Sequence, residues 1–323
     1  MRVIELINSA IESKECRFAF ELLPPLKGDD INTLFSTVDK LKVFNPAYIN
    51  VTYHREDVKY VEREDGLLER RISKKRPGTV AIAAALMAKY SIEVVPHLIC
   101  GGFSKYDTED ALIDLSFLGI DNVLALRGDN LKNEKFFEPS TNGHTHAIDL
   151  VKQVISMNSG IYVDTEVEHS HPTNFCVGVA CYPEKHIESP NLDMDIEYLK
   201  AKVNAGADYI ITQMFFDNSH YFNLVERCRK EGITVPIIPG IKPLSTKSQL
   251  SMLPQIFHVD IPQELALAVG AAKDNKEVRK IGIDWAIKQC KELKAYNVPV
   301  IHFYTMGKAD NIEAIANEVF ISE

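Results

Sequence analysis

The stretch FCVGVAC (Phe175–Cys181) is a short apolar run of the kind that forms a β-strand buried on both faces. Seven similar runs lie elsewhere in the 323-residue chain. They are Arg17–Glu21, Tyr48–Thr52, Glu93–Leu98, Asn122–Leu126, Tyr209–Gln213, Pro236–Gly240 and Val300–Tyr304. Because helices must cover a strand that is buried on both faces, the eight runs predict a parallel sheet in an α/β fold.

Helical patterns separate these runs. Asp30–Phe44, Asp107–Leu118 and Lys276–Ala295 each place apolar residues on one helix face. Eight alternating strand–helix units predict a (β/α)8 TIM barrel, which we expect to form one domain over residues 1–323. The rival is a doubly wound sheet, which usually has fewer strands and carries GxGxxG when it binds dinucleotides. The sequence contains no GxGxxG.

Two connections are longer than usual for a barrel of this kind. Val163–Asn174 is polar, and we expect it to be exposed. The segment between Ile241 and Pro299 contains helical patterns of its own, which makes it an elaboration of the barrel. At the N-terminus, Ile4, Ile7 and Ile11 are spaced as on an amphipathic helix, and the segment does not resemble a signal peptide.

Composition excludes several classes of partner. Acidic residues outnumber Lys and Arg by 45 to 36, for a net charge of −9, which argues against binding to nucleic acid or anionic membranes. No apolar run approaches the ~18 residues of a membrane span. The six cysteines form no CxxC, so we expect a reduced, cytoplasmic protein. The pairs His144/His146 and His169/His171 lie in polar loops, and we expect solvated histidines and no metal site.

Barrel enzymes place their active site at the C-terminal ends of the strands. Glu21 ends an apolar strand before two prolines, where burial would raise its pKa and suit it to general acid chemistry. The alternative is a surface glutamate that ends a strand. Arg127 and Asp129 could bind an anion and the N–H groups of a ring, or simply pair with each other in a turn. Gln213 ends the run Tyr209–Gln213, and its neutral amide suits the edge of a heterocycle.

Eight motifs, in register along nearly the whole chain, carry a family resemblance. They are FELLPP (Phe20–Pro25), VTY (Val51–Tyr53), PHL (Pro96–Leu98), ALRGD (Ala125–Asp129), CYPEKH (Cys181–His186), KVNAGADYIITQMFFD (Lys202–Asp217), IIPGIKP (Ile237–Pro243) and HFYT (His302–Thr305). The sequence resembles the methylenetetrahydrofolate reductases, specifically the bacterial catalytic form without the regulatory domain of the eukaryotic enzymes. The resemblance implies a (β/α)8 barrel that binds FAD and forms a homo-oligomer.

The resemblance also implies a ping-pong reaction of one-carbon metabolism that serves methionine biosynthesis. NADH or NADPH reduces FAD and leaves, and 5,10-methylenetetrahydrofolate then receives the hydride to give 5-methyltetrahydrofolate. The bacterial resemblance favours NADH. Glu21 matches the general acid that assists opening of the folate's five-membered ring, and Asp129 matches the carboxylate shared between flavin and folate. Gln213, Gln249 and Lys308 match positions that bind substrate.

The remaining matches are positions that contact FAD. They are Thr52, Tyr53, His97, Arg127, Gly128, Asp129, His146, Ala147, Tyr182, His186, Asp195 and Lys202. The chain also departs from the family pattern at several positions. Among them, His146 replaces a frequent tyrosine, Leu253 a frequent phenylalanine and Lys308 an arginine, so Lys308 keeps the charge but loses the bidentate fork.

Three other functions are compatible with a barrel. A metal-assisted hydrolase or an aldolase would need converging metal ligands or a Schiff-base lysine at a strand end, and we identify neither in the sequence. A flavin dehydrogenase of the proline-oxidising kind would reduce its flavin with substrate instead of NAD(P)H. A folate- or flavin-binding module without catalysis would not need the set formed by Glu21, Asp129 and Gln213.

Overall fold

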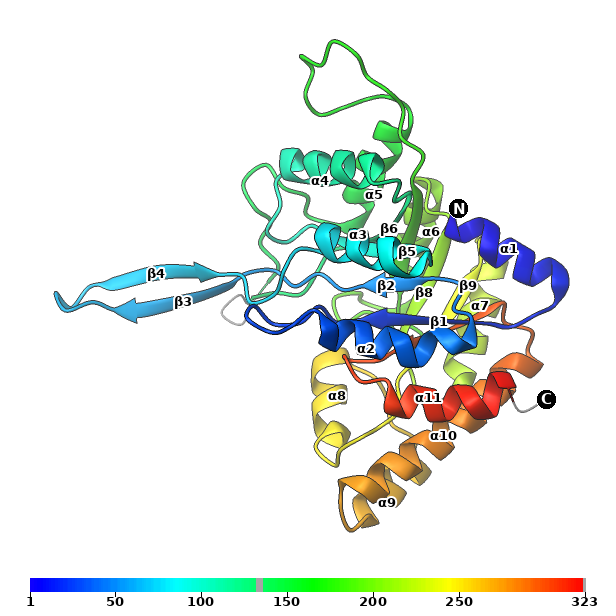
Figure 1. Ribbon diagram of the computed structural model, residues 1–323. Helices are drawn as coiled ribbons and strands as arrows, with labels where there is room; N and C mark the ends of the chain where they lie inside the picture. Colours follow the sequence, from blue (N-terminus) through cyan, green and yellow to red (C-terminus); the bar gives the residue numbers. More distant parts are fainter. Residues whose placement is uncertain (132–135, 322–323) are drawn as a thin grey trace.

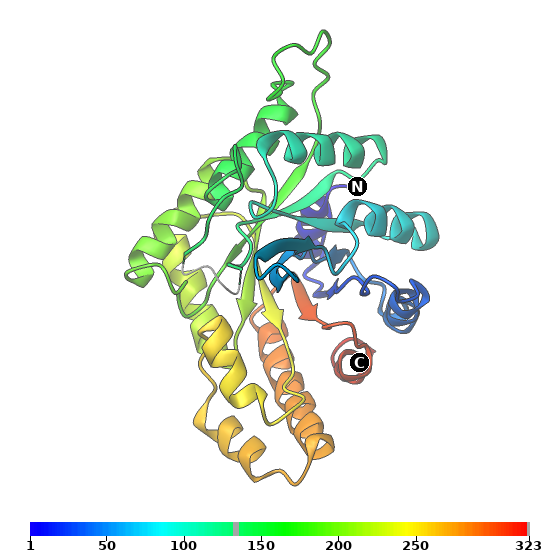
Figure 2. The ribbon, with the colours of Figure 1, turned by 90° about the vertical axis from the view of Figure 1, so that its left-hand side faces the viewer.

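The computed structural model describes residues 1–131 and 136–321, in which eight parallel strands close into a barrel. The predicted (β/α)8 fold is therefore confirmed, and each predicted strand end lies within one residue of the observed end. Figure 2 views the barrel along its axis, from the end at which the strands finish. In order around the barrel, the strands are β1 (Arg17–Leu22), β2 (Ile49–Val51), β5 (Val94–Ile99), β6 (Asn122–Leu126), β7 (Cys176–Cys181), β8 (Tyr209–Met214), β9 (Ile237–Ile241) and β10 (Val300–Tyr304).

Helices follow the strands and cover the outside of the barrel (Figures 1 and 2). The three helices predicted from apolar spacing are present, with ends shifted by a few residues. The outer helices are α2 (Asn32–Leu41), α3 (Thr79–Tyr90), α4 (Lys105–Phe117), α5 (Ala147–Asn158), α6 (Leu192–Asn204), α7 (Asn218–Lys230), α10 (Asn275–Ala295) and α11 (Asp310–Ala316). A 3-10 turn, η1 (Lys42–Phe44), extends α2, and a π-helical turn, η2 (Asn317–Ile321), extends α11.

The N-terminal helix α1 (Val3–Ser13) closes the end of the barrel opposite the strand C-termini. Its buried Val3 and Ile7 pack on the inward-facing residues of the barrel. The backbone N–H of Val3 also donates to Asn122 Oδ1 at 2.7 Å, at the start of β6. The amphipathic spacing at the N-terminus therefore forms a plug, which leaves the opposite mouth as the accessible end.

Tyrosine side chains fill the barrel interior above two glycines. A Cβ on Gly178 would lie 2.5 Å from Tyr209 Cζ, and one on Gly240 would lie 2.6 Å from Tyr304 Cε2. Contacts this short do not occur between non-bonded carbons, so only glycine leaves room for each ring. The interior is thus a packed core with no open pore.

A two-stranded antiparallel ribbon, β3 (Asp57–Glu62) and β4 (Leu68–Ser73), extends from the mouth after β2 (Figure 1). Its base is tied to the turn after β1, since Lys27 N donates to Lys75 O at 2.8 Å. The sequence analysis did not predict this ribbon. The dipeptide Asp65-Gly66 could have predicted it, because Asp-Gly favours tight hairpin turns and lies here between two stretches of alternating side chains.

The two long connections behave as predicted. Residues 163–174 form a largely exposed loop that extends away from the barrel (Figures 1 and 2). The segment after β9 adds α8 (Gln249–Phe257) and α9 (Gln263–Ala271) ahead of α10. These helices enclose an apolar cluster, separate from the main core, that includes Met214, Phe216 and Leu253. Among the described residues, no helix is both long and apolar enough to span a membrane.

Candidate active site

The mouth of the barrel brings Glu21, Asn50 and His97 together from three adjacent strands. Glu21 lies on β1, opposite Asn50 of β2 in the strand register, and His97 lies on β5. His97 Nε2 is 3.4 Å from Glu21 Oε2, and Asn50 Nδ2 donates to the same ring nitrogen at 3.2 Å. Only 14% of the Glu21 side chain and 6% of the His97 side chain are exposed. The three side chains thus form one buried polar group at the mouth.

Burial sets the protonation states of this group. Desolvation raises the pKa of Glu21 to about 8, as its position at the end of an apolar strand predicts. Desolvation, with smaller contributions from His302 and His54, lowers the pKa of His97 to about 3. At neutral pH the carboxyl keeps its proton and the imidazole is uncharged. Glu21 therefore has the properties of a general acid.

A second group forms beside it, at the ends of β6 and β7. Arg127 binds both carboxylate oxygens of Glu188, and the rings of Tyr182 and His186 lie 4.7 Å apart, edge to face. The backbone N–H of His186 donates to Asp195 Oδ2 at 2.9 Å. The structure thus pairs Arg127 with Glu188, and not with Asp129 as the alternative interpretation of the sequence would have it.

Lys202 of α6 completes this second group. Its Nζ donates to the carbonyl of Ala180 on β7 at 2.6 Å, and desolvation lowers its pKa. The pKa of His186 is also lowered, first by desolvation and then by the nearby Arg127. A histidine, a lysine and an arginine close together provide the donor set that binds a phosphate.

Some polar atoms near the mouth have no partner in the described part of the chain. Thr52 Oγ1, just after β2, and Asn130 Oδ1, just after β6, are both buried without a hydrogen bond. Gly128, two residues before Asn130, has a φ of +85° and would bring a Cβ within 3.2 Å of Ile99. Buried polar atoms normally have partners, so Thr52 and Asn130 leave hydrogen bonds for a bound molecule.

The predicted substrate residues lie on three different elements. Gln213 is half-buried on β8, and its Oε1 accepts from the N–H of Met214 at 2.9 Å. Gln249 begins α8, where its Oε1 accepts from the N–H groups of Ser245 and Thr246. Lys308 is exposed on the loop after β10. The side-chain oxygen of each glutamine is therefore occupied, and its amide NH2 is the group that remains for a ligand.

The remaining predicted FAD positions surround the second group more loosely. His146 is largely exposed and precedes α5, and Ala147 is the first residue of that helix. Tyr53 follows β2, with its ring 5.0 Å from Phe103. His97 does not end its strand, because β5 continues to Ile99.

Sequence analysis missed two residues of the mouth. Asn50 is fully buried in β2. A polar residue within an apolar strand is unusual, and this could have marked Asn50 as a candidate site residue. Lys242 follows β9 directly and is only 7% exposed. The sequence analysis identified no lysine at a strand end that could form a Schiff base. The structure corrects this at Lys242, because desolvation lowers the pKa of its ammonium group.

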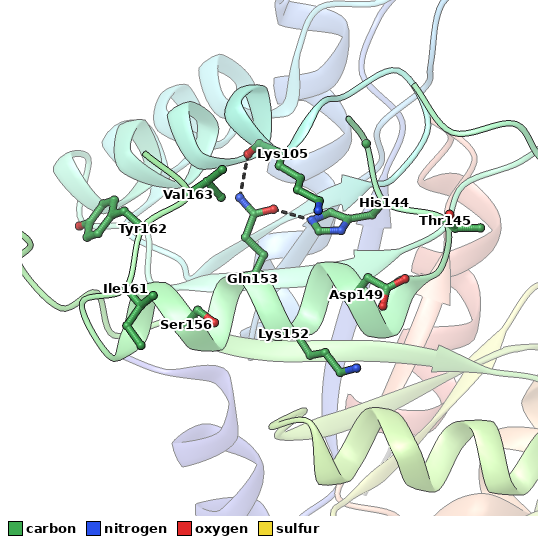
Figure 3. Close-up of a pocket in the computed structure, with 11 residues that line it drawn as sticks. Lys105, His144, Thr145, Asp149, Lys152, Gln153, Ser156, Ile161, Tyr162 and Val163 are labelled. Atoms are coloured by element: carbon green, nitrogen blue, oxygen red, sulfur yellow. Dashed lines mark hydrogen bonds between the residues drawn. The ribbon is translucent and has the colours of Figure 1, made fainter. Parts of the chain in front are cut away.

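A cavity of about 470 Å³ lies outside the barrel, between α4, α5 and the segment that follows α5 (Figure 3). Gln153 at its wall donates to Lys105 O at 2.7 Å and accepts from His144. His144 is therefore buried, and the expectation of a solvated histidine is wrong at this position. None of the predicted site residues lines this cavity. Among residues 1–131 and 136–321, no cluster of three or more His, Cys, Asp or Glu side chains could hold a metal ion.

Comparisons with known proteins identify the family to which the chain is related. The family model of methylenetetrahydrofolate reductase matches residues 6–319. The chain is 32% identical to methylenetetrahydrofolate reductase (NADH) 1 of Arabidopsis thaliana, over 95% of this chain and 49% of that protein. It is 30% identical to 5,10-methylenetetrahydrofolate reductase of Salmonella typhimurium, over 93% of this chain and 89% of that protein. The chain thus spans about half the length of the plant relative and most of the bacterial one.

A solved structure shares the fold at low sequence identity. It is a Clostridium thermocellum protein described as binding two copies of 5-methyl-5,6,7,8-tetrahydrofolic acid, with a TM-score of 0.56 and 12% identity over 98% of both chains. At that identity the likeness supports the barrel alone. The family model and the bacterial relative cover nearly the whole chain, and they show that it belongs to the methylenetetrahydrofolate reductase family.

Proposed function

We propose that this protein reduces 5,10-methylenetetrahydrofolate to 5-methyltetrahydrofolate with electrons from NADH or NADPH. Family membership supports the reaction class. The observation that carries the proposal is Glu21, a buried carboxyl with a pKa of about 8 at the mouth of the barrel. Opening the five-membered ring of the folate requires a proton on its leaving nitrogen, and Glu21 holds a proton at neutral pH.

The residues at the mouth fit FAD. Arg127, His186 and Lys202 would hold its phosphates. Thr52 Oγ1 and Asn130 Oδ1 have no hydrogen-bond partner among the described residues, so the hydroxyl could donate to FAD or accept from it, and the amide oxygen could accept from it. Tyr53, His97, Gly128, His146, Ala147, Tyr182 and Asp195 belong to the same proposed binding surface. When bound, FAD would accept a hydride from the nicotinamide and pass it to the folate, one co-substrate at a time.

The protein's own groups have separate tasks in this proposal. Glu21 would donate the proton, with the uncharged ring of His97 packed beside its carboxyl. Asp129 would orient the folate ring against the flavin, and the amide NH2 of Gln213 would bind the ring edge. Gln249 and Lys308 would bind the remainder of the folate, with Lys308 at the outer end because it is exposed.

An anaerobic visible spectrum tests the proposal. The purified protein should show a flavin band that NADH bleaches and that methylenetetrahydrofolate then restores. A protein that takes up no FAD would overturn the proposal. A flavin band that neither NADH nor NADPH changes would favour a dehydrogenase of the proline-oxidising kind.

The details of the co-substrate and the assembly follow from the family resemblance. We propose NADH as the preferred donor, and relatives named for NADH and for NADPH both exist. We further propose a cytoplasmic homo-oligomer with no nucleic-acid or membrane partner. Parallel titrations with NADH and NADPH and a sedimentation measurement test these points.

A further inference from the structure

Lys242 is a cation without a counter-ion at the mouth of the barrel. It is 7% exposed, and in the described part of the chain its ammonium group makes no hydrogen bond or ion pair. The residues on either side of it in sequence, Ile241 and Pro243, are buried as well. Most of this side chain is removed from water, and desolvation lowers its pKa, so the ammonium group would gain more from a bound anion than an exposed lysine would.

The side-chain alternation of β9 gives Lys242 its direction. Ile237 and Ile241 belong to the cluster between barrel and helices, whereas Ile238 belongs to the cluster inside the barrel. Gly240 also faces inward, because a Cβ there would meet the ring of Tyr304. Successive strand residues point to opposite faces, so Lys242 lies on the inward face, one step above Gly240.

The strands next to β9 carry residues of the candidate active site. On one side is β8, which carries Gln213. On the other side is β10, whose Tyr304 pairs in register with Glu21 of β1. Lys242 therefore stands between the proposed ring-binding amide and the proposed general acid around the rim of the mouth.

We propose that Lys242 binds a negatively charged oxygen, a carboxylate or a phosphate, of the co-substrate that occupies the mouth. This inference rests on the proposed function. The oxygen comes from one of two sources, the glutamate carboxylates of the folate or the phosphates of the nicotinamide nucleotide. Lys308, which is exposed on the loop after β10, would be a separate contact further out along the folate.

The test is the Lys242→Met substitution, which keeps the length of the side chain and removes its charge. Calorimetric titration of the flavin-loaded protein with 5-methyltetrahydrofolate, and separately with NAD+, which carries the same phosphates as NADH but cannot reduce the flavin, measures the affinity for each source. We expect the affinity for one of them to fall about 10- to 100-fold, as for a lost charge-assisted hydrogen bond. The ligand that weakens identifies the source, and weakening of both shows that both place an anionic oxygen there.

Two further variants keep the test interpretable. Lys242→Arg retains the charge and should retain most of the affinity. Lys247→Met removes an exposed lysine nearby, whose ammonium group donates to the carbonyl of Gly270, and should change neither affinity. Without ligand, Lys242→Met should melt at a higher temperature than the wild type, because a buried charge without a partner has been removed.

Unchanged affinity for both ligands in Lys242→Met would overturn the inference. A lower melting temperature of Lys242→Met would overturn it as well, if Lys242→Arg lost as much ligand affinity as Lys242→Met. Failure of the proposed function looks different. In that case the wild-type protein itself would bind neither NAD+ nor 5-methyltetrahydrofolate, whatever residue stands at position 242.

Discussion

His97 Nε2 lies 3.4 Å from Glu21 Oε2, and neither group is charged at neutral pH. The contact therefore brings a protonated carboxyl against a neutral imidazole. Since Asn50 donates to the same ring nitrogen, strand β2 also holds the ring in place. Desolvation is what keeps the proton on Glu21.

Replacing Glu21 by Gln removes the acid and leaves its shape. We expect reduction of the flavin by NADH to continue, and the rate of flavin reoxidation by methylenetetrahydrofolate to fall by about 100-fold or more. Stopped-flow absorbance measures the two half-reactions separately. Folate-dependent reoxidation at the wild-type rate would remove Glu21 from the acid role.

The protonation of Glu21 also predicts two pH dependences. The rate of the folate half-reaction should decline as pH rises through about 8. The rate of flavin reduction by NADH should not show this decline. Because the pKa is higher in the folded state than in the unfolded one, the wild type should lose stability relative to Glu21→Gln as pH rises from 4.5 to about 8. Urea titrations at several pH values measure the second effect, and parallel curves for the two proteins would contradict it.

Replacing Asp129 by Asn keeps the size of the side chain and removes its charge. We expect folate reduction to slow by about 10-fold, since a charge-assisted hydrogen bond to the substrate is lost. The melting temperature of the variant is the control for misfolding. Unchanged kinetics would assign Asp129 a purely structural role.

His302 predicts a sensitivity to acid. It is fully buried, neither ring nitrogen has a hydrogen-bond partner among the described residues, and desolvation lowers its pKa to about 3. The unfolded state binds the proton first, so stability should fall as pH drops from 6.5 towards 3. His302→Phe, which keeps the stacking on Tyr48, should flatten this slope. The exposed His169→Gln is the matched control, and equal slopes in all three proteins would refute the prediction.

Two glycines give a packing test with opposite outcomes. A Cβ at Gly240 would lie 2.4 Å from the carbonyl oxygen of Thr212, so Gly240→Ala should destabilise the fold by about 1–3 kcal/mol. Gly270 lies in α9 with nothing within 4 Å of a Cβ, so Gly270→Ala should stabilise it by about 0.5–1 kcal/mol. Chemical denaturation of both variants measures the difference. A stable Gly240→Ala would contradict this packing and show that both the Thr212 backbone and the Tyr304 ring can move aside.

The sequence predicts the barrel well because each barrel strand is a continuous apolar run with its own helix. It does not predict the ribbon β3–β4, whose side chains are charged and mostly exposed, so no apolar run marks it. Glu21 could be predicted because its position at the end of an apolar strand implies desolvation. Lys242 could not, because a lysine beside a proline usually indicates an exposed loop, and only the closure of the barrel buries it.

The fit of Tyr209 over Gly178 restricts how this barrel can evolve. A larger residue at position 178 collides with the ring, and with Leu124 Cδ1 at 2.8 Å, for as long as tyrosine remains at position 209. An evolving lineage can therefore enlarge residue 178 only after a smaller residue has replaced Tyr209. That replacement leaves a void until the residue at position 178 becomes larger. Homologues should accordingly carry either the glycine–tyrosine pair or a swapped pair of similar total volume, with few single exchanges between them.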